Sequence, residues 1–474
     1  MMQNDSDVDR FLENPGEYFG SSLTKMLNTP RAQIEALQLA GLKRRFGQMR
    51  GHLPMMDRLA DAQGIVAINV INDVLPLLFD HAVYKSYPAS LLEKQRYAQL
   101  TSWLNKLTTH DISGTDVSAC KSIDDWMIAI KRDTPLSICH TSGTTGTMSF
   151  LPWSKVEWRR MLKQYPVLFF QKYGAETPVE KPPLNIDCIF PSFRTGGMSH
   201  TVVNDAIVDI VAGNEQRFHA AYPTRLSADM MLLAVKRRVA AANGTLDRLQ
   251  ISPDIESRRA DFEKQQREMP ERINQFFTTM QTQLAGRRVY IQAISSMLFT
   301  LAESGLKKGL KKVFAPNSVI VTGGGGKGIV LPPDWKETVN EFFGVERIFN
   351  NYGMSEMSTQ MPGCLQGNYH STPSMIPYIL DPVTMQPLPR KGTVKGQFGF
   401  FDLMVDTRWG GFVTADEVTM EWDKPCACGI PTPYLHSHIQ RVNSRNDDGD
   451  EKLSCAASPT AYAEALDFLN AETV

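Results

Sequence analysis

The chain of 474 residues lacks an apolar run long enough to cross a membrane. Its longest apolar stretch, residues 65–79, is interrupted by Asn69, Asn72, Asp73 and Pro76. The first residues have neither the basic start nor the apolar core of a signal peptide. We therefore expect no membrane span and interpret the protein as cytoplasmic.

The sequence also lacks an excess of charge of either sign. Fifty lysines and arginines face 51 acidic residues, for a net charge of −1, which argues against a nucleic-acid partner bound through a basic face. The seven cysteines are odd in number, which without a signal peptide fits reduced thiols in a cytoplasm. A hydrophobic content of 42% is typical of a soluble globular enzyme, and the length exceeds one simple core.

Hydroxyls and glycines are concentrated at residues 141–147, which read Thr-Ser-Gly-Thr-Thr-Gly-Thr. The run follows a strand-like apolar segment at 136–139 and precedes a helix-like stretch at 155–170. Glycines allow a tight turn with bare N–H groups and the hydroxyls add donors, so this loop suits a polyphosphate. It lacks the Lys-Ser or Lys-Thr pair of a P-loop, and a flexible linker is the alternative interpretation.

The spacing of apolar residues predicts mostly helix up to about residue 135. Beyond it we expect strands at 184–190 and 289–294, and helices at 226–241, 255–284 and 296–309, with a break near Pro270. Short strands at 392–394, 397–401, 412–414 and 418–422 predict a small β-rich subdomain.

A β-branched strand at 318–322 opens onto four glycines, and a helix at 333–343 and a strand at 345–349 follow. This order is the βαβ signature of a parallel, doubly wound sheet. The loops at Thr141, Gly323 and Asn350 all leave the carboxyl ends of predicted strands. Because ligands bind at that edge of such sheets, we expect the three loops to converge on one crevice.

Two segments together resemble a known family. Residues 141–146 resemble the phosphate-binding motif of the adenylate-forming superfamily, which includes acyl-CoA synthetases, luciferases and peptide-synthetase adenylation domains. Residues 351–356, Asn-Tyr-Gly-Met-Ser-Glu, resemble its aromatic-Gly-x-Thr/Ser-Glu signature. The resemblance covers about 135–441 and is closest to phenylacetate-CoA ligases and acyl-protein synthetases.

The resemblance implies a multi-subdomain α/β large domain over residues 1–440. Within it we expect a helical region to about 135, an α/β core at about 136–380 and a β-rich subdomain at about 381–440. A short tail at 441–474 follows, in which the family's usual C-terminal domain is largely absent. That domain carries a lysine that stabilises the adenylation transition state, and the basic residue usual after the phosphate loop is also missing here.

The implied activity is ATP-dependent activation of a small-molecule carboxylic acid to an acyl-adenylate with release of pyrophosphate. Coenzyme A, a carrier-protein thiol or an amine could then accept the acyl group. The alternative, favoured by the short tail, is a degenerate nucleotide-binding partner or scaffold protein without full ligase activity.

The resemblance also implies the roles of individual residues. ATP would be bound by Thr141, Ser142, Gly143, Thr144, Thr145, Gly146, Gly323, Gly324, Gly325, Asn351, Tyr352, Gly353, Asp416 and Arg441. Within this set Tyr352 would stack on adenine, and Asp416 and Arg441 would contact the ribose, with Arg445 as a competitor for Arg441. Thr144, Ser355 and Glu356 would be catalytic, with Glu356 binding Mg²⁺. The acid would lie against Phe193, Gly197, Met198 and Gly326.

A thiol pair, Cys426 and Cys428, and the nearby Cys364 and His370 form a set suited to tetrahedral zinc. Phenylacetate-CoA ligase relatives carry a similar pairing. Four protein ligands leave no open position, so this zinc would be structural. Reduced, unligated cysteines are the alternative interpretation, and His436 and His438 are alternative ligands.

Overall fold

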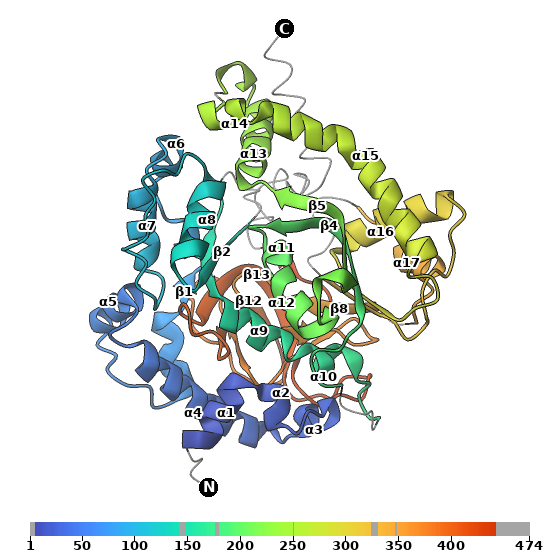
Figure 1. Ribbon diagram of the computed structural model, residues 1–474. Coiled ribbons are helices and arrows are strands. Elements are labelled where there is room, and N and C mark those ends of the chain that lie inside the picture. Colours follow the sequence, from blue (N-terminus) through green and yellow to red (C-terminus); the bar gives the residue numbers. More distant parts are fainter. Residues whose placement is uncertain are drawn as a thin grey trace.

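The computed structural model describes residues 5–141, 147–175, 180–249, 251–323, 330–346 and 348–441. The strands of these residues form a six-stranded sheet, a seven-stranded sheet and a separate two-stranded hairpin. Helices surround all three (Figure 1).

The six-stranded sheet has the order β5 (Phe218–Leu226), β4 (Asp187–Gly196), β6 (Val289–Gln292), β7 (Val319–Gly323), β8 (Ile348–Tyr352) and β9 (Met361–Pro362). The first five strands are mutually parallel, and β9 is antiparallel to β8. The parallel part confirms the doubly wound sheet that the βαβ pattern predicts.

Successive side chains of a strand point to opposite sides of the sheet, and here the side chains on both sides are buried. Ile189, Ile291 and Ile320 pack on one face with α13 (Ala228–Ala242), α15 (Arg259–Thr282), α16 (Ser295–Lys307) and α17 (Trp335–Phe343). Phe190 and Tyr290 face the other side, where α9 (Lys155–Leu162), α10 (Tyr165–Phe170) and α12 (Asn204–Ile207) contribute to the core. The continuous apolar runs of these strands follow from burial on both faces.

Several details of the expected elements are wrong. Strand β8 begins three residues later than predicted, so that Asn350 and Asn351 lie within it, paired with Thr322 and Gly323 of β7. Strand β4 continues to Gly196 instead of ending at 190. Helix α15 passes unbroken through Pro270. A proline removes one helical hydrogen bond, and the buried side chains on the last turns of α15, Phe276, Phe277 and Met280, hold the helix in place regardless.

The seven-stranded sheet has the order β10 (Tyr369–His370), β14 (Tyr434–Leu435), β13 (Gly411–Glu421), β12 (Thr393–Asp402) and β11 (Met375–Leu380). Strands β1 (Phe79–Asp80) and β15 (Gln440–Arg441) also pair with β13. The four short strands expected between 392 and 422 are therefore two long ones, which pair with each other across a register shift between Gln397 and Gly399.

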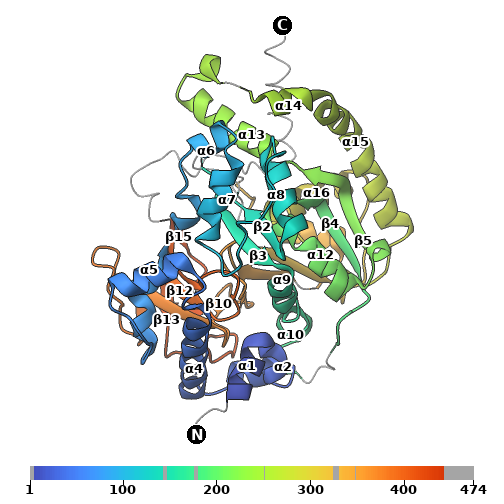
Figure 2. The same cartoon turned by 60° about the vertical axis from the view of Figure 1, so that its left-hand side comes forward.

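The N-terminal region is helical, as its apolar spacing predicts. It contains α1 (Asp5–Glu13), α2 (Pro15–Tyr18), α3 (Leu23–Asn28), α4 (Arg31–Met49), α5 (Pro54–Ala62), α6 (Ser90–Glu93), α7 (Tyr97–Asn105), α8 (Ile123–Asp133) and the 3₁₀ segments η1 (Ile71–Leu77) and η2 (Val83–Lys85). Helix α4, near the bottom of Figure 2, lies at the start of β11, where Gln38 donates to the carbonyl oxygens of Pro373 and Met375.

The remaining helical segments are short: α11 (Ser199–Val202), α14 (Pro253–Ser257), η4 (Glu215–Arg217), η5 (Leu246–Arg248) and the π-helical η3 (Val208–Ala212). Across the described ranges, we find no helix with the length and apolar character needed to span a bilayer.

The hairpin consists of β2 (Leu136–His140) and β3 (Phe150–Ser154), which are antiparallel. The expectation that residue 141 leaves a strand of the parallel sheet is therefore wrong, since the 141–147 run lies between the two arms of a hairpin. The hairpin nevertheless joins the end of β4. His140 forms a parallel bridge with Met198, and its N–H donates to the carbonyl oxygen of Gly197 at 2.7 Å. This attachment brings Thr141, where the run begins, to the carboxyl edge of the sheet by another route.

Candidate active site and metal centre

The loop that follows β8 is held by side chains from outside it. The Trp153 indole N–H donates to the carbonyl oxygen of Ser355, and Arg408 Nη2 donates to that of Glu356, both at 3.1 Å. The N–H groups of Ser358 and Thr359 both donate to Asp402 Oδ2 at 2.7 Å. Residues 355–359, which contain two of the three predicted catalytic residues, Ser355 and Glu356, therefore have a backbone fixed at four positions. We call these residues the signature loop.

A buried ion pair lies beneath the signature loop. Arg408 Nη1 is 2.8 Å from Glu157 Oε1, and the two side chains are 1% and 0% exposed. The hydroxyls of Ser358 and Thr407 donate to the two carboxylate oxygens of Glu157. Burial raises the pKa of Glu157, and the charge of Arg408 opposes that rise. Paired and hydrogen-bonded in this way, two charges can be kept in the interior.

The signature loop lies next to the strand that leads into the hydroxyl-rich run. Burial raises the pKa of the Cys139 thiol, near the end of β2, to about 12. The charge of Glu356 adds to the rise, and a hydrogen bond with the Ser355 side chain opposes it. Ser355 therefore lies beside Cys139, two residues before Thr141, and Glu356 is near enough for its charge to act on the thiol.

Thr141 closes the described part of the hairpin. Its N–H donates to the carbonyl oxygen of Ser149, and its hydroxyl accepts from the Ser149 N–H. The Tyr87 hydroxyl donates to the carbonyl oxygen of Met148 on the opposite arm. The predicted phosphate ligands Ser142, Gly143, Thr144, Thr145 and Gly146 lie outside the described residues, as do Gly324, Gly325, Gly326 and Arg445.

Three further predicted residues come together at the end of β8. The Tyr352 hydroxyl donates to Asp416 Oδ2 at 2.7 Å, and Arg441 Nε lies 3.1 Å from Asp416 Oδ1. Asp416 and Arg441 are also directly paired between β13 and β15. Burial raises the pKa of Tyr352 well above its usual value, so its hydroxyl keeps the proton that it donates. Tyr352 packs edge-on against Phe398 and is 9% exposed.

The other predicted nucleotide residues lie at the β7–β8 edge. A β-carbon on Gly323 would be 2.8 Å from the carbonyl oxygen of Asn351, so the close approach of the two strands requires glycine there. A β-carbon on Gly353 would be 2.7 Å from the side-chain oxygen of Gln360. The amide of Asn351 donates to that same oxygen.

The described residues expected to line the acid pocket, Phe193, Gly197 and Met198, are all buried. A β-carbon on Gly197 would be 2.3 Å from His140 Cδ2, so the backbone at Gly197 lies directly against this imidazole. Met198 follows it and is 7% exposed. Phe193 is 2% exposed and packs on Tyr222 in the core of the parallel sheet, with ring centroids 5.0 Å apart.

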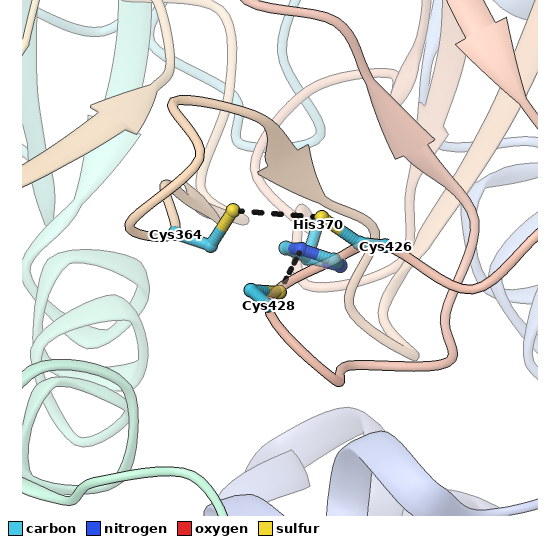
Figure 3. Close-up of side chains that lie close together, drawn as sticks. All are labelled: Cys364, His370, Cys426 and Cys428. Carbon is cyan, nitrogen blue, oxygen red and sulfur yellow. Dashed lines mark hydrogen bonds between the residues drawn. The ribbon is translucent and has the colours of Figure 1, made fainter.

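The four predicted zinc ligands form one cluster (Figure 3), and their ligand atoms all lie within 4.8 Å of one another. The Cys364 and Cys426 sulfurs are 3.8 Å apart, and Cys428 Sγ is 3.3 Å from His370 Nε2. Bonds of about 2.3 Å to sulfur and about 2.0 Å to nitrogen give tetrahedral edges of about 3.8 Å between sulfurs and about 3.5 Å between sulfur and nitrogen. The donor set and both separations fit a tetrahedral metal.

The surroundings of the cluster also fit a metal. Burial lowers the pKa of His370 to about 4, so its imidazole is neutral near pH 7, the form that binds a metal. Its Nδ1 lies 3.1 Å from the Thr432 hydroxyl, an orienting contact of the kind found around metal-bound histidines. Gly429, with a φ of +88°, allows the chain to turn after Cys428. The alternative ligands His436 and His438 are not members of this cluster.

No family model matches the sequence, and no curated protein matches it either. The fold is similar to that of a solved acyl-CoA ligase, which agrees with the fold that the two sequence signatures imply. A crystal structure of 2-hydroxyisobutyryl-CoA ligase, in an open conformation with 2-HIB-AMP and CoA, superposes with a TM-score of 0.50 at 14% identity. The match covers 88% of this chain and 71% of that one.

Two further solved structures give lower scores. The same ligase in its thioesterification state has a TM-score of 0.48 at 15% identity, over 87% of this chain and 69% of that one. ATP-bound MatB from Rhodopseudomonas palustris has a TM-score of 0.36 at 15% identity, over 64% and 47%.

Proposed function

We propose that this protein uses ATP to activate a carboxylic acid as an acyl-adenylate. One observation supports this most directly: the signature loop lies against Cys139 and Trp153, on the two hairpin strands that flank the hydroxyl-rich run. The strands that flank one motif thus contact the other motif, which lies about two hundred residues away in the sequence and which the resemblance assigns to the same nucleotide.

In the proposed reaction, an oxygen of the acid attacks the α-phosphorus of ATP and the bond to pyrophosphate breaks. Charge accumulates around the phosphates, so fixed donors and a cation are the effective catalysts. The Ser355 hydroxyl would donate to the α-phosphate. Glu356 would hold Mg²⁺, whose charge offsets that of the phosphates. Asp416 would accept from the ribose hydroxyls, next to Arg441 and Tyr352.

The same proposal defines the acyl acceptor only by its chemical class. A thiol, of coenzyme A or of a carrier protein, or an amine can attack an acyl-adenylate and release AMP. The ligase with the TM-score of 0.50 was crystallised with an acyl-adenylate and CoA, which makes CoA the first acceptor to test.

The proposal predicts that labelled pyrophosphate exchanges into ATP when the correct acid is present. A panel of aliphatic, hydroxylated and aromatic acids, each assayed with Mg²⁺, should contain at least one that supports exchange. Glu356→Gln should abolish that exchange and leave the fold intact. Glu337→Gln, on the exposed surface of α17, is the matched control and should exchange normally.

Two results would contradict the proposal. Full exchange in Glu356→Gln would remove the assigned role of that carboxylate. ATP binding without exchange across the whole acid panel, with candidate partners added, would favour the nucleotide-binding scaffold instead.

We also propose that the Cys364–His370–Cys426–Cys428 cluster binds a structural zinc ion. With all four positions taken by protein side chains, the ion would link β10 to the segment after β13 and take no part in the chemistry. Purified protein should contain about one zinc per chain, and Cys428→Ser should lower both zinc content and melting temperature. Cys120→Ser, at a thiol outside the cluster, should change neither. Zinc-free protein with unchanged stability would refute this assignment.

A further inference from the structure

We propose that Arg408 is a positioning residue, whose buried guanidinium fixes the Glu356 peptide and thereby the direction of the Glu356 carboxylate. The inference rests on the proposed function, because it concerns the residue proposed there to hold Mg²⁺. Neither the family signatures nor the spacing of the sequence points to Arg408.

The contacts of Arg408 leave its guanidinium little freedom. Nη1 donates to the carbonyl oxygen of Pro152 at 3.1 Å and to Glu157 Oε1 at 2.8 Å, while Nη2 donates to the carbonyl oxygen of Glu356. The guanidinium carbon lies 4.1 Å from the centre of the Trp153 ring, within cation–π range. A planar fork reaches these partners from two separate nitrogens, whereas an ammonium offers all its N–H donors from a single atom.

The Glu356 side chain leaves the backbone between two fixed carbonyl groups. Trp153 holds the carbonyl of Ser355, and Arg408 holds that of Glu356. Fixing two successive peptide planes fixes the backbone dihedral angles of the residue between them, and with these the direction of its Cα–Cβ bond. Release of one carbonyl would let the carboxylate turn away without unfolding the loop.

The same side chains connect the signature loop to the hairpin. Trp153 is on β3, and Glu157 is in the first turn of α9, which begins directly after β3. Trp153 stacks on Trp158 with centroids 3.8 Å apart. Arg408 therefore sets the Glu356 carboxylate relative to the strand that emerges from the predicted phosphate loop.

The test compares Arg408→Lys with Arg45→Lys as the matched control. Arg45 is also buried and donates to a backbone carbonyl, that of Leu403, but it makes no contact with the signature loop. In Arg408→Lys, the Mg²⁺ concentration for half-maximal pyrophosphate exchange should rise by roughly tenfold, the effect of losing one charge-assisted hydrogen bond. Metal-free ATP binding should stay the same. Arg45→Lys should keep the normal Mg²⁺ requirement.

A second measurement does not depend on activity. Backbone amide hydrogen exchange at 355–359 should become faster in Arg408→Lys and not in Arg45→Lys. If Arg408→Lys fails to fold, the double substitution Glu157→Gln with Arg408→Met removes both buried charges and should show the same two changes.

The outcomes separate the two proposals. A normal Mg²⁺ requirement in Arg408→Lys, or an equal rise in Arg45→Lys, overturns the positioning role. If the unmodified protein shows no pyrophosphate exchange with any acid, the proposed function fails. The amide exchange then decides whether Arg408 still fixes the loop, and unchanged protection at 355–359 overturns that as well.

Discussion

His140 should make the stability of the protein fall in mild acid. Its side chain is fully buried, and burial lowers its pKa from 6.5 to about 4, with the nearby Thr141 carbonyl opposing the shift. His140 Nδ1 lies 3.0 Å from that carbonyl oxygen, so this nitrogen carries the proton. Nε2 has no hydrogen-bond partner among the residues that the structure describes.

The direction of the pH dependence of stability follows from the lowered pKa of His140. Between about pH 6.5 and pH 4 the unfolded chain binds a proton at this histidine and the folded chain does not. The contribution of neutral His140 is therefore complete above about pH 6.5 and is lost as the pH falls towards 4. From these two pKa values, the loss between about pH 7.5 and pH 5 is about 2 kcal/mol.

The assay is denaturant unfolding of the unmodified protein and of His140→Gln at both pH values. Other groups titrate in this range. Burial raises the pKa of Asp229 to about 7, which gives a dependence of the opposite sign, because that stability is lost as the pH rises. The contributions of these other groups are common to both proteins. The difference between the pH dependences of their unfolding free energies therefore isolates the contribution of His140. Parallel pH dependences, within about 0.5 kcal/mol, would refute the reasoning.

Glycine positions provide further tests by denaturant unfolding. Gly305→Ala should destabilise the protein by about 1–3 kcal/mol, because the new β-carbon would lie 2.1 Å from the Phe342 ring on α17. Gly47→Ala, in α4 with nothing within 4 Å, should instead stabilise it by about 0.5–1 kcal/mol. Gly197→Ala should destabilise by about 1–3 kcal/mol and slow pyrophosphate exchange, because the His140 imidazole must move; an unchanged exchange rate would contradict this.

The parallel sheet could be predicted because its sequence signals are local. The strand at 319–323 is β-branched and buried on both faces, and α17 is followed by Gly344, whose φ of +74° suits glycine after a helix end. The four cluster residues could also be predicted, since thiols and imidazoles are few in this chain and thus conspicuous.

The support beneath the signature loop could not be predicted. Glu157 and Arg408 are 251 residues apart, and in a sequence such charged residues are typical of a solvated surface. The sequence does not indicate the role of Asp402 either, although its carboxylate accepts hydrogen bonds from two N–H groups of the signature loop. The antiparallel pairing of β2 with β3 was also hidden, because the intervening loop is longer than the turns that mark a hairpin.

The cysteine cluster has a consequence for the order of folding. Cys364 and His370 precede strands β11, β12 and β13, and Cys426 and Cys428 follow them. The ends of this antiparallel meander meet only after its three strands have paired. The Cys364 and Cys426 thiols therefore remain accessible to a thiol-reactive probe until the meander has assembled. The time at which these two thiols become protected during refolding then reports when this sheet forms.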